Sequence, residues 1–242
     1  EGTLNMAGSD IMNDYYSIGM AARNAGKVVN KLGGVINVTG NYGIGMFAEG
    51  AGSRAENHGT INLMSSGELK GAYGMYLNNG AYGYIASGAS IKSGAYSGSS
   101  DKESLIGVAV LNGSTLENHG TIDIDARNSN GIYVRNGIIK NYGTINISGA
   151  NSHAVRSKNS TIDGTTPVSD SNIGGTVNAS NGASGFRQDP DINNNVGVGV
   201  GGTQISPTGV VTVNGELVNI HDMTPGPDPL TGNFAFSNVG IY

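Results

Sequence analysis

Asn118-His119-Gly120-Thr121-Ile122-Asp123-Ile124 recurs, with substitutions, along most of this 242-residue chain. Asn141–Ile147 reads NYGTINI and Asn57–Leu63 reads NHGTINL. Weaker copies begin at residues 2, 34, 89, 175 and 209. Taking the leading small residue of every copy as the marker, the steps are 32, 25, 30, 31, 23, 32 and 34 residues. A repeat of roughly 30 residues indicates a solenoid, a propeller or a stacked array.

The composition suits strands separated by frequent turns. Glycine provides 41 residues, charged residues are 13%, and cysteine and tryptophan are absent. The 13 Lys and Arg are scattered singly in a chain of net charge -5, so we expect no nucleic-acid partner. No apolar run approaches the roughly 20 residues that span a bilayer.

Alternation of apolar and polar residues predicts three strands in each repeat. Three apolar columns should therefore face inward. The Gly-Thr-Ile strand places Leu4, Ile36, Ile61, Ile91, Ile122, Ile145 and Val177 inward. A strand that starts at glycine places Met20, Met46, Met75, Val108, Ile132, Val155 and Phe186 inward. A short third strand contributes Val28, Ala55, Ile85, Leu116 and Ile139.

These columns predict an all-β chain, a right-handed parallel β-helix of about seven to eight triangular coils of roughly 30 residues. We expect residues 1–242 to form a single β-helix segment of a longer protein, with residues 186–242 as divergent coils with longer loops. Loops should project at residues 96–103, 157–171, 188–195 and 224–229.

Asparagine recurs at two corners of the predicted coil. One column is Asn30, Asn57, Asn118 and Asn141, and the other is Asn24, Asn79, Asn112 and Asn136. Asparagine accepts left-handed turn dihedrals, and its amide can bond to the same amide one coil away. We interpret both columns as structural ladders, with glycan-binding amides as the alternative.

The Asn-x-Gly-Thr-Ile-Asn-Ile repeats, followed by Gly-Ile-Tyr-Val strands, resemble the passenger domains of type V autotransporters. They look most like the large fusobacterial-type outer-membrane autotransporter adhesins, over roughly residues 1–190. The resemblance implies export through a C-terminal β-barrel that this chain does not include, display at the outer membrane and a role in adhesion. It transfers no binding residue, because the shared motif is scaffold.

Catalytic and metal chemistry finds little support in the sequence. A β-helix polysaccharide lyase or hydrolase needs converging carboxylates. Asp123 and Asp125 face the same way, but we expect Asp123 to pair with Lys92 in the preceding coil.

Two further groups of residues are candidate metal ligands, and neither has the pattern of a metal site. Asp189 and Asp191 share a loop with three asparagines and could hold calcium, although a solvated loop is the simpler interpretation. His58 and His119 occupy equivalent corners two coils apart, with Gly88 expected between them. We therefore predict no enzyme activity, no metal and no cofactor.

Aromatic side chains are the better candidates for function. Tyrosine can stack on a sugar or anchor a protein partner while its hydroxyl stays hydrated. We predict a binding patch in which the tyrosines around residue 76 crowd one coil. Its residues are Phe47, Tyr73, Tyr76, Tyr82, Tyr84, Tyr96 and Tyr133. The partner would be a glycan or protein receptor on a host cell or another bacterium. A tyrosine-covered sheet without ligand, a pure spacer and a polysaccharide-cleaving enzyme remain alternatives.

Overall fold

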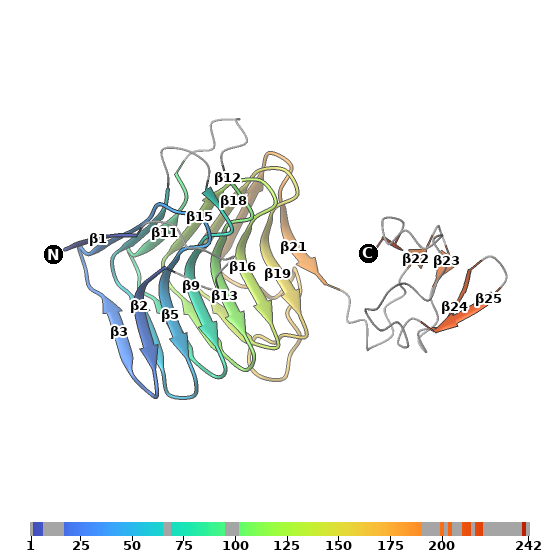
Figure 1. Ribbon diagram of the computed structural model, residues 1–242, viewed down its shortest axis with the longest axis horizontal. Coiled ribbons are helices and arrows are strands. Elements are labelled where there is room, and N and C mark those ends of the chain that lie inside the picture. The colour runs from blue at the N-terminus through green and yellow to red at the C-terminus, as the bar shows by residue number, and fades with distance from the viewer. Residues whose placement is uncertain are drawn as a thin grey trace. The chain divides into compact units, whose positions relative to one another are not determined.

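The computed structural model describes residues 2–6, 17–64, 69–94 and 102–189, together with the backbone of five short strands between residues 199 and 240 (Figure 1). The chain divides into two compact units, Glu1–Gln188 and Asp189–Tyr242. No helix occurs among the described residues, and accordingly none that could cross a membrane.

Three parallel sheets form the first unit. The first sheet contains β1 (Thr3–Met6), β4 (Val35–Val38), β7 (Thr60–Leu63), β11 (Ser90–Lys92), β15 (Thr121–Asp125), β18 (Thr144–Ser148) and β20 (Thr176–Ser180). The second contains β2 (Ile18–Arg23), β5 (Ile44–Glu49), β9 (Tyr73–Asn78), β13 (Ile106–Leu111), β16 (Asn130–Arg135), β19 (His153–Lys158) and β21 (Ser184–Gln188). The third contains β3 (Lys27–Asn30), β6 (Arg54–Asn57), β10 (Tyr82–Ile85), β14 (Thr115–Asn118) and β17 (Ile138–Asn141).

Each strand pairs with its equivalent one coil away, so successive coils lie side by side along the stack (Figure 1). A further small pair joins β8 (Leu69–Lys70) to β12 (Lys102–Glu103). The predicted parallel β-helix is confirmed.

The two longer inward columns are confirmed as the core. Ile36, Ile61, Ile91, Ile122 and Ile145 are completely buried and lie in register along the first sheet. The second sheet contributes Met46, Met75, Val108, Ile132 and Val155, which are also completely buried. Burial of an aliphatic side chain contributes about 1.5–3 kcal/mol, so these columns are the main source of stability.

The prediction for the third strand was wrong at Ile85. Gly83, not Ile85, lies in register with Ala55 and Leu116, and Ile85 lies opposite Asn57 and Asn118. The corner after β10 holds residues 86–89 before Ser90, whereas the corner after β6 holds only residues 58–59 before Thr60. Counting back from the Gly-Thr-Ile motif therefore placed Ile85 in this column instead of Gly83, an error of two residues.

The first asparagine column forms a buried ladder. The Asn30 amide donates to Asn57 Oδ1 over 2.8 Å, and the Asn118 amide donates to Asn141 Oδ1 over 2.7 Å. Ile85 separates the two pairs, so the Asn57 amide donates instead to the carbonyl of Ser90 over 3.1 Å. The ladder satisfies polar groups where the chain turns inside the core.

The second asparagine column supplies turn geometry. Asn24, Asn79, Asn112 and Asn136 have φ angles of 54°, 54°, 50° and 50°. These values lie in the left-handed region that asparagine tolerates. The side chains of this column do not bond to one another, since Asn112 donates to Asn78 instead. The predicted left-handed turns are confirmed, and the predicted ladder is limited to the first column.

Residues 157–171 include an ordered turn after β19. The carboxylate of Asp163 accepts hydrogen bonds from the backbone N–H groups of Thr166 and Thr165 over 2.6 and 2.8 Å. These bonds, followed by those from the two threonine hydroxyls, hold the pKa of Asp163 well below its usual range. Of the other predicted loops, residues 96–101, 190–195 and 224–229 lie outside the described residues.

The described strands of the second unit pair differently. They are β22 (Gly199–Val200), β23 (Thr203–Gln204), β24 (Val210–Val213), β25 (Glu216–Asn219) and β26 (Val239–Gly240), and all of their pairings are antiparallel. The motif copy at residues 209–213 lies largely in β24, which pairs with β25. Parallel coils are therefore described up to residue 188, and their continuation through residues 186–242 stays a prediction.

Replacing Asn118 with alanine should destabilise the stack. The change removes the bond to Asn141 and leaves the buried N–H of Gly120 without its 3.1 Å acceptor. We expect a loss of about 1–3 kcal/mol, measured by urea unfolding. Asn178→Ala is the matched control, because Asn178 is exposed and donates to Asn146 on the outside. Equal effects of the two changes would contradict a structural role for the buried ladder.

Candidate binding site

Glycines near the start of the second-sheet strands lie close to the isoleucine column of the first sheet. A Cβ on Gly45 would lie 2.9 Å from Ile61 Cγ2, and one on Gly107 would lie 2.7 Å from Ile122 Cγ2. A Cβ at either position would force the isoleucine to move, so glycine favours this close approach of the second sheet. In β19 the equivalent residue is the next smallest, Ala154. Tyr73 and Tyr76, which lie on either side of Gly74 in β9, line the same outer hollow.

That hollow brings together three of the predicted binding residues. We call it the aromatic groove. It has a volume of about 320 Å³ and is lined by Ile18, Arg23, Ile44, Phe47, Glu49, Tyr73, Tyr76 and Asn78. Phe47 and Tyr76 stack with ring centroids 5.8 Å apart, and Tyr73 meets Tyr76 edge-on at 5.3 Å. Tyr73 and Tyr76 are partly exposed, whereas Phe47 is only 7% exposed. Phe47 therefore occupies the same outer column as Tyr76, but its neighbours cover it and it forms the floor of the groove.

A polar cluster closes one end of the aromatic groove. Arg23 Nε lies 3.2 Å from the Glu49 carboxylate, and its guanidinium lies 5.1 Å from the Phe47 ring centroid. The Asn78 amide donates to Glu49 over 3.5 Å. The groove thus combines aromatic walls with a few convergent polar groups, which is typical of sites that bind a ligand.

The other predicted residues lie elsewhere. Tyr133 is in the outer column of Tyr76 but two coils further along, beyond Ala109, and Arg156 lies 5.7 Å from its ring centroid. Tyr82 and Tyr84 belong to the same coil as Tyr76, but they are on β10 of the third sheet and do not line the aromatic groove. Tyr96 lies outside the described residues.

Sequence reasoning missed two carboxylates on the outer face of the third sheet. Glu56, Tyr84 and Glu117 occupy one outer column on three successive strands. Glu56 pairs with Lys27 at 2.8 Å, and Glu117 accepts hydrogen bonds from Tyr82 Oη over 3.0 Å and His119 Nε2 over 2.8 Å. Glu56 directly precedes the ladder residue Asn57, and Glu117 directly precedes Asn118. Comparing the residue before each ladder asparagine would therefore have revealed this column in the sequence.

The ring of Tyr84 lies between His58 and His119, where a glycine was expected. By backbone pairing, Ala86 and not Gly88 is the residue between His58 and His119. The ring of Tyr84 fills the space that Ala86 leaves, with its centroid 5.7 Å from His58 and 5.5 Å from His119. His119 then stacks on Tyr142 at 4.9 Å.

Hydrogen bonds keep both carboxylates of this face ionised. Burial alone would raise the pKa of Glu56, but hydrogen bonds from Lys27, Arg54 and His58 outweigh it and lower that pKa. The hydrogen bond from His119 is the main cause of the lowered pKa of Glu117, with burial opposing it. Burial, followed by the bond to Glu117, raises the pKa of Tyr82 to about 12. A glycosidase acid needs a raised pKa, so this pair fits an ionic network better than an acid/base pair.

The pKa of Asp123 is raised, in contrast to those of Glu56 and Glu117. Burial of its carboxyl group and then the charge of Asp125 raise the pKa of Asp123, against the attraction of Lys92. Lys92 and Asp123 are in register, yet these two described side chains form no ion pair, so the predicted pairing was wrong. The two aspartates are the described residues that come nearest to the carboxylate chemistry of a β-helix enzyme.

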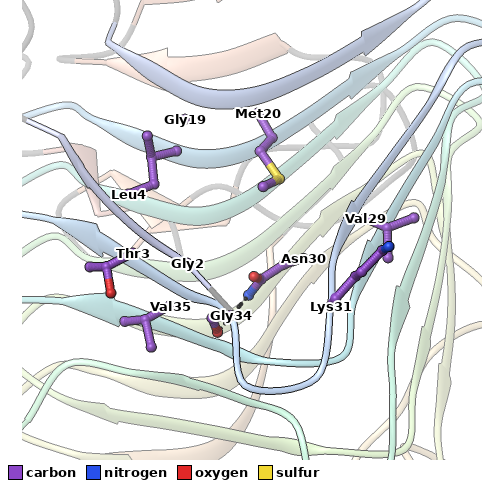
Figure 2. A pocket seen from close by; sticks show the side chains of 10 residues that line it. All are labelled: Gly2, Thr3, Leu4, Gly19, Met20, Val29, Asn30, Lys31, Gly34 and Val35. Carbon is purple, nitrogen blue, oxygen red and sulfur yellow. Dashed lines mark hydrogen bonds between the residues drawn. The ribbon is translucent and has the colours of Figure 1, made fainter.

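A larger hollow of about 470 Å³ lies at the first coil (Figure 2). Leu4 and Met20 point into it from the first and second sheets, and the amide of Asn30 bonds to the carbonyl of Gly34 over 3.4 Å. Among the described residues that line it, Lys31 is the only charged one. These are scaffold residues of the motif, so this hollow offers less for recognition than the aromatic groove. Among the described residues no cluster of three or more His, Cys, Asp and Glu could hold a metal ion, and Asp191 lies outside them.

The ionised carboxylates predict how stability depends on pH. The folded pKa values of Glu56 and Glu117 lie below their ordinary value of 4.5, so their stabilisation is complete above pH 4.5 and is lost as the pH falls through the folded values. Urea unfolding should therefore show a midpoint that falls in acid. Glu117→Gln should flatten this fall, and a midpoint that stays constant or rises in acid would contradict the network.

Comparison with known proteins supports the fold. Residues 1–88 match the family model described as the BigA third pectate lyase-like domain. The match covers the first coils of the stack and is consistent with a bacterial surface β-helix protein and with an extracellular or cell-surface location. Neither a curated protein nor a solved structure matches the chain.

Proposed function

We propose that the chain is a non-catalytic segment of a bacterial surface adhesin and that it binds its receptor in the aromatic groove. The receptor would be a glycan or a protein on a host cell or on another bacterium. The observation that carries this proposal is the gathering of Phe47, Tyr73 and Tyr76 in one hollow of about 320 Å³. These residues are on β5 and β9, and each of the two strands pairs in parallel with a neighbour on both sides. The groove is therefore built on a rigid support.

The chemistry of the groove suits recognition more than catalysis. Tyrosine supplies a large contact area at a low loss of side-chain entropy, and its hydroxyl can bond to a sugar or to a peptide. Arg23 and Glu49 neutralise each other at 3.2 Å, so the groove has polar edges without a strong net charge. A neutral glycan or an uncharged protein loop therefore fits better than a polyanion.

The resemblance to autotransporter passengers gives the proposal its cellular setting. In that setting the β-helix would be exported through a β-barrel and displayed at the outer membrane, with the coils as a stiff support for the groove. The match of residues 1–88 to a pectate lyase-like domain of BigA supports a surface β-helix in general. The adhesin role, the autotransporter pathway and a part in virulence belong to this proposal.

Removing the two partly exposed tyrosines tests the groove directly. Tyr73→Ser combined with Tyr76→Ser should weaken binding to a glycan-array hit, or to whole cells, by at least about tenfold, or ~1.4 kcal/mol. Tyr142→Ser is the matched control, because Tyr142 is 61% exposed and belongs to the ring column of His119, away from the groove. Unchanged binding of the double variant would favour a spacer that carries no receptor site here.

A polysaccharide-cleaving enzyme is the second candidate. The raised pKa of Asp123 beside Asp125, together with the pectate lyase-like match, favours it over other enzymes. We expect no release of reducing or unsaturated ends from acidic or neutral polysaccharides, with or without calcium. Cleavage that disappears in Asp123→Asn would replace the adhesin proposal with a catalytic one.

A further inference from the structure

Four cationic side chains share the outer face at the far end of the second sheet. They are Arg135 on β16, Arg156 and Lys158 on β19, and Arg187 on β21. The strands β13, β16, β19 and β21 contain none of the chain's 18 Asp and Glu. In a chain of net charge -5 these four strands therefore carry a net positive charge, with Asp189 as the acid that directly follows β21. We call the four cations the basic quartet.

The register sets the basic quartet in two like-charged pairs. Arg135 lies opposite Lys158, and Arg156 lies opposite Arg187. Paired strands are about 4.8 Å apart, and like charges directly opposite each other destabilise a sheet. On the third sheet Lys27 and Arg54 both pair with Glu56, at 2.8 and 3.2 Å. Arg135 and Lys158, by contrast, form no ion pair with any of the described carboxylates.

This arrangement fits an anionic chain that runs along the stack. Guanidinium groups bind pairs of oxyanion oxygens in a fork, and three of the four cations are arginines. Single-stranded nucleic acid needs open aromatic faces for its bases, but Arg156 already lies over the Tyr133 ring at 5.7 Å. A DNA duplex is read by an element that enters a groove, and a flat sheet face offers none.

We propose that the outer face of β16, β19 and β21 binds an extended sulfated polysaccharide. Arg135 and Lys158 form one anchoring pair for sulfate groups, and Arg156 and Arg187 form the other. The first pair spans β16 and β19, and the second spans β19 and β21. An extended chain that crosses these three strands therefore meets both pairs. This surface is distinct from the aromatic groove, whose Arg23 is neutralised by Glu49.

Size-defined heparin fragments, titrated into the 242-residue chain at near-physiological salt, test the proposal. Arg135→Gln combined with Lys158→Gln should weaken binding by at least about tenfold and reduce the slope of log affinity against log salt by about two. Lys31→Gln combined with Lys92→Gln is the matched control, because both lysines are exposed and lie outside the second sheet. Circular dichroism checks that both variants keep the wild-type fold.

Several results would overturn the proposal. They are the absence of heparin binding, equal binding by the Arg135→Gln and Lys158→Gln variant, or equally tight binding of fully desulfated heparin. If a DNA duplex bound as tightly as heparin, the surface would attract polyanions in general and would not be specific for sulfated polysaccharide. Tyr73→Ser with Tyr76→Ser should leave heparin binding unchanged, so a failure of the groove and a failure of the basic quartet are distinguishable.

Discussion

Parallel hydrogen bonding of each strand to its equivalent one coil away is the constraint on which the molecule depends. It places like residues over like residues, so the column Ile36, Ile61, Ile91, Ile122 and Ile145 is continuous and completely buried. The second sheet can approach this column because glycine occupies its strand starts, as the 2.9 Å approach of a Gly45 Cβ to Ile61 indicates. Strand pairing and core packing therefore reinforce each other along the whole first unit.

The same constraint leaves the outer columns free to vary, and each face has acquired a different chemistry. Near its first strands the second sheet is aromatic, with Phe47 as floor and Tyr73 and Tyr76 as walls. Further along the same sheet the outer columns become cationic. The third sheet instead balances its charges, with Glu56 and Glu117 held ionised by their hydrogen-bond partners. A rigid stack can thus carry several surfaces without changing its core.

Much of the fold could be predicted because its signal is local and repeated. The Gly-Thr-Ile and Gly-Met motifs recur often enough for the inward columns to be read from alternation alone. Ile85 could not be placed, because the two additional residues at the corner after β10 are invisible to a count from the next motif. The burial of Phe47 also escaped prediction, since it depends on neighbours such as Tyr76 in the next coil and Arg23 in the preceding one. The shared outer column of Glu56 and Glu117 can be recognised only when the register across three coils is known.

Amide hydrogen exchange resolved by residue tests the stacked-coil account most directly. The account predicts the slowest exchange at the ladder amides of β5, β9, β13 and β16, which have a coil on each side, and faster exchange at β1 and β20. Protection should repeat with the coil period, with unprotected turns at residues such as Asn79 and Asn112. Fast exchange throughout the central strands, or protection with no coil period, would contradict a cooperative parallel stack as the support for both binding surfaces.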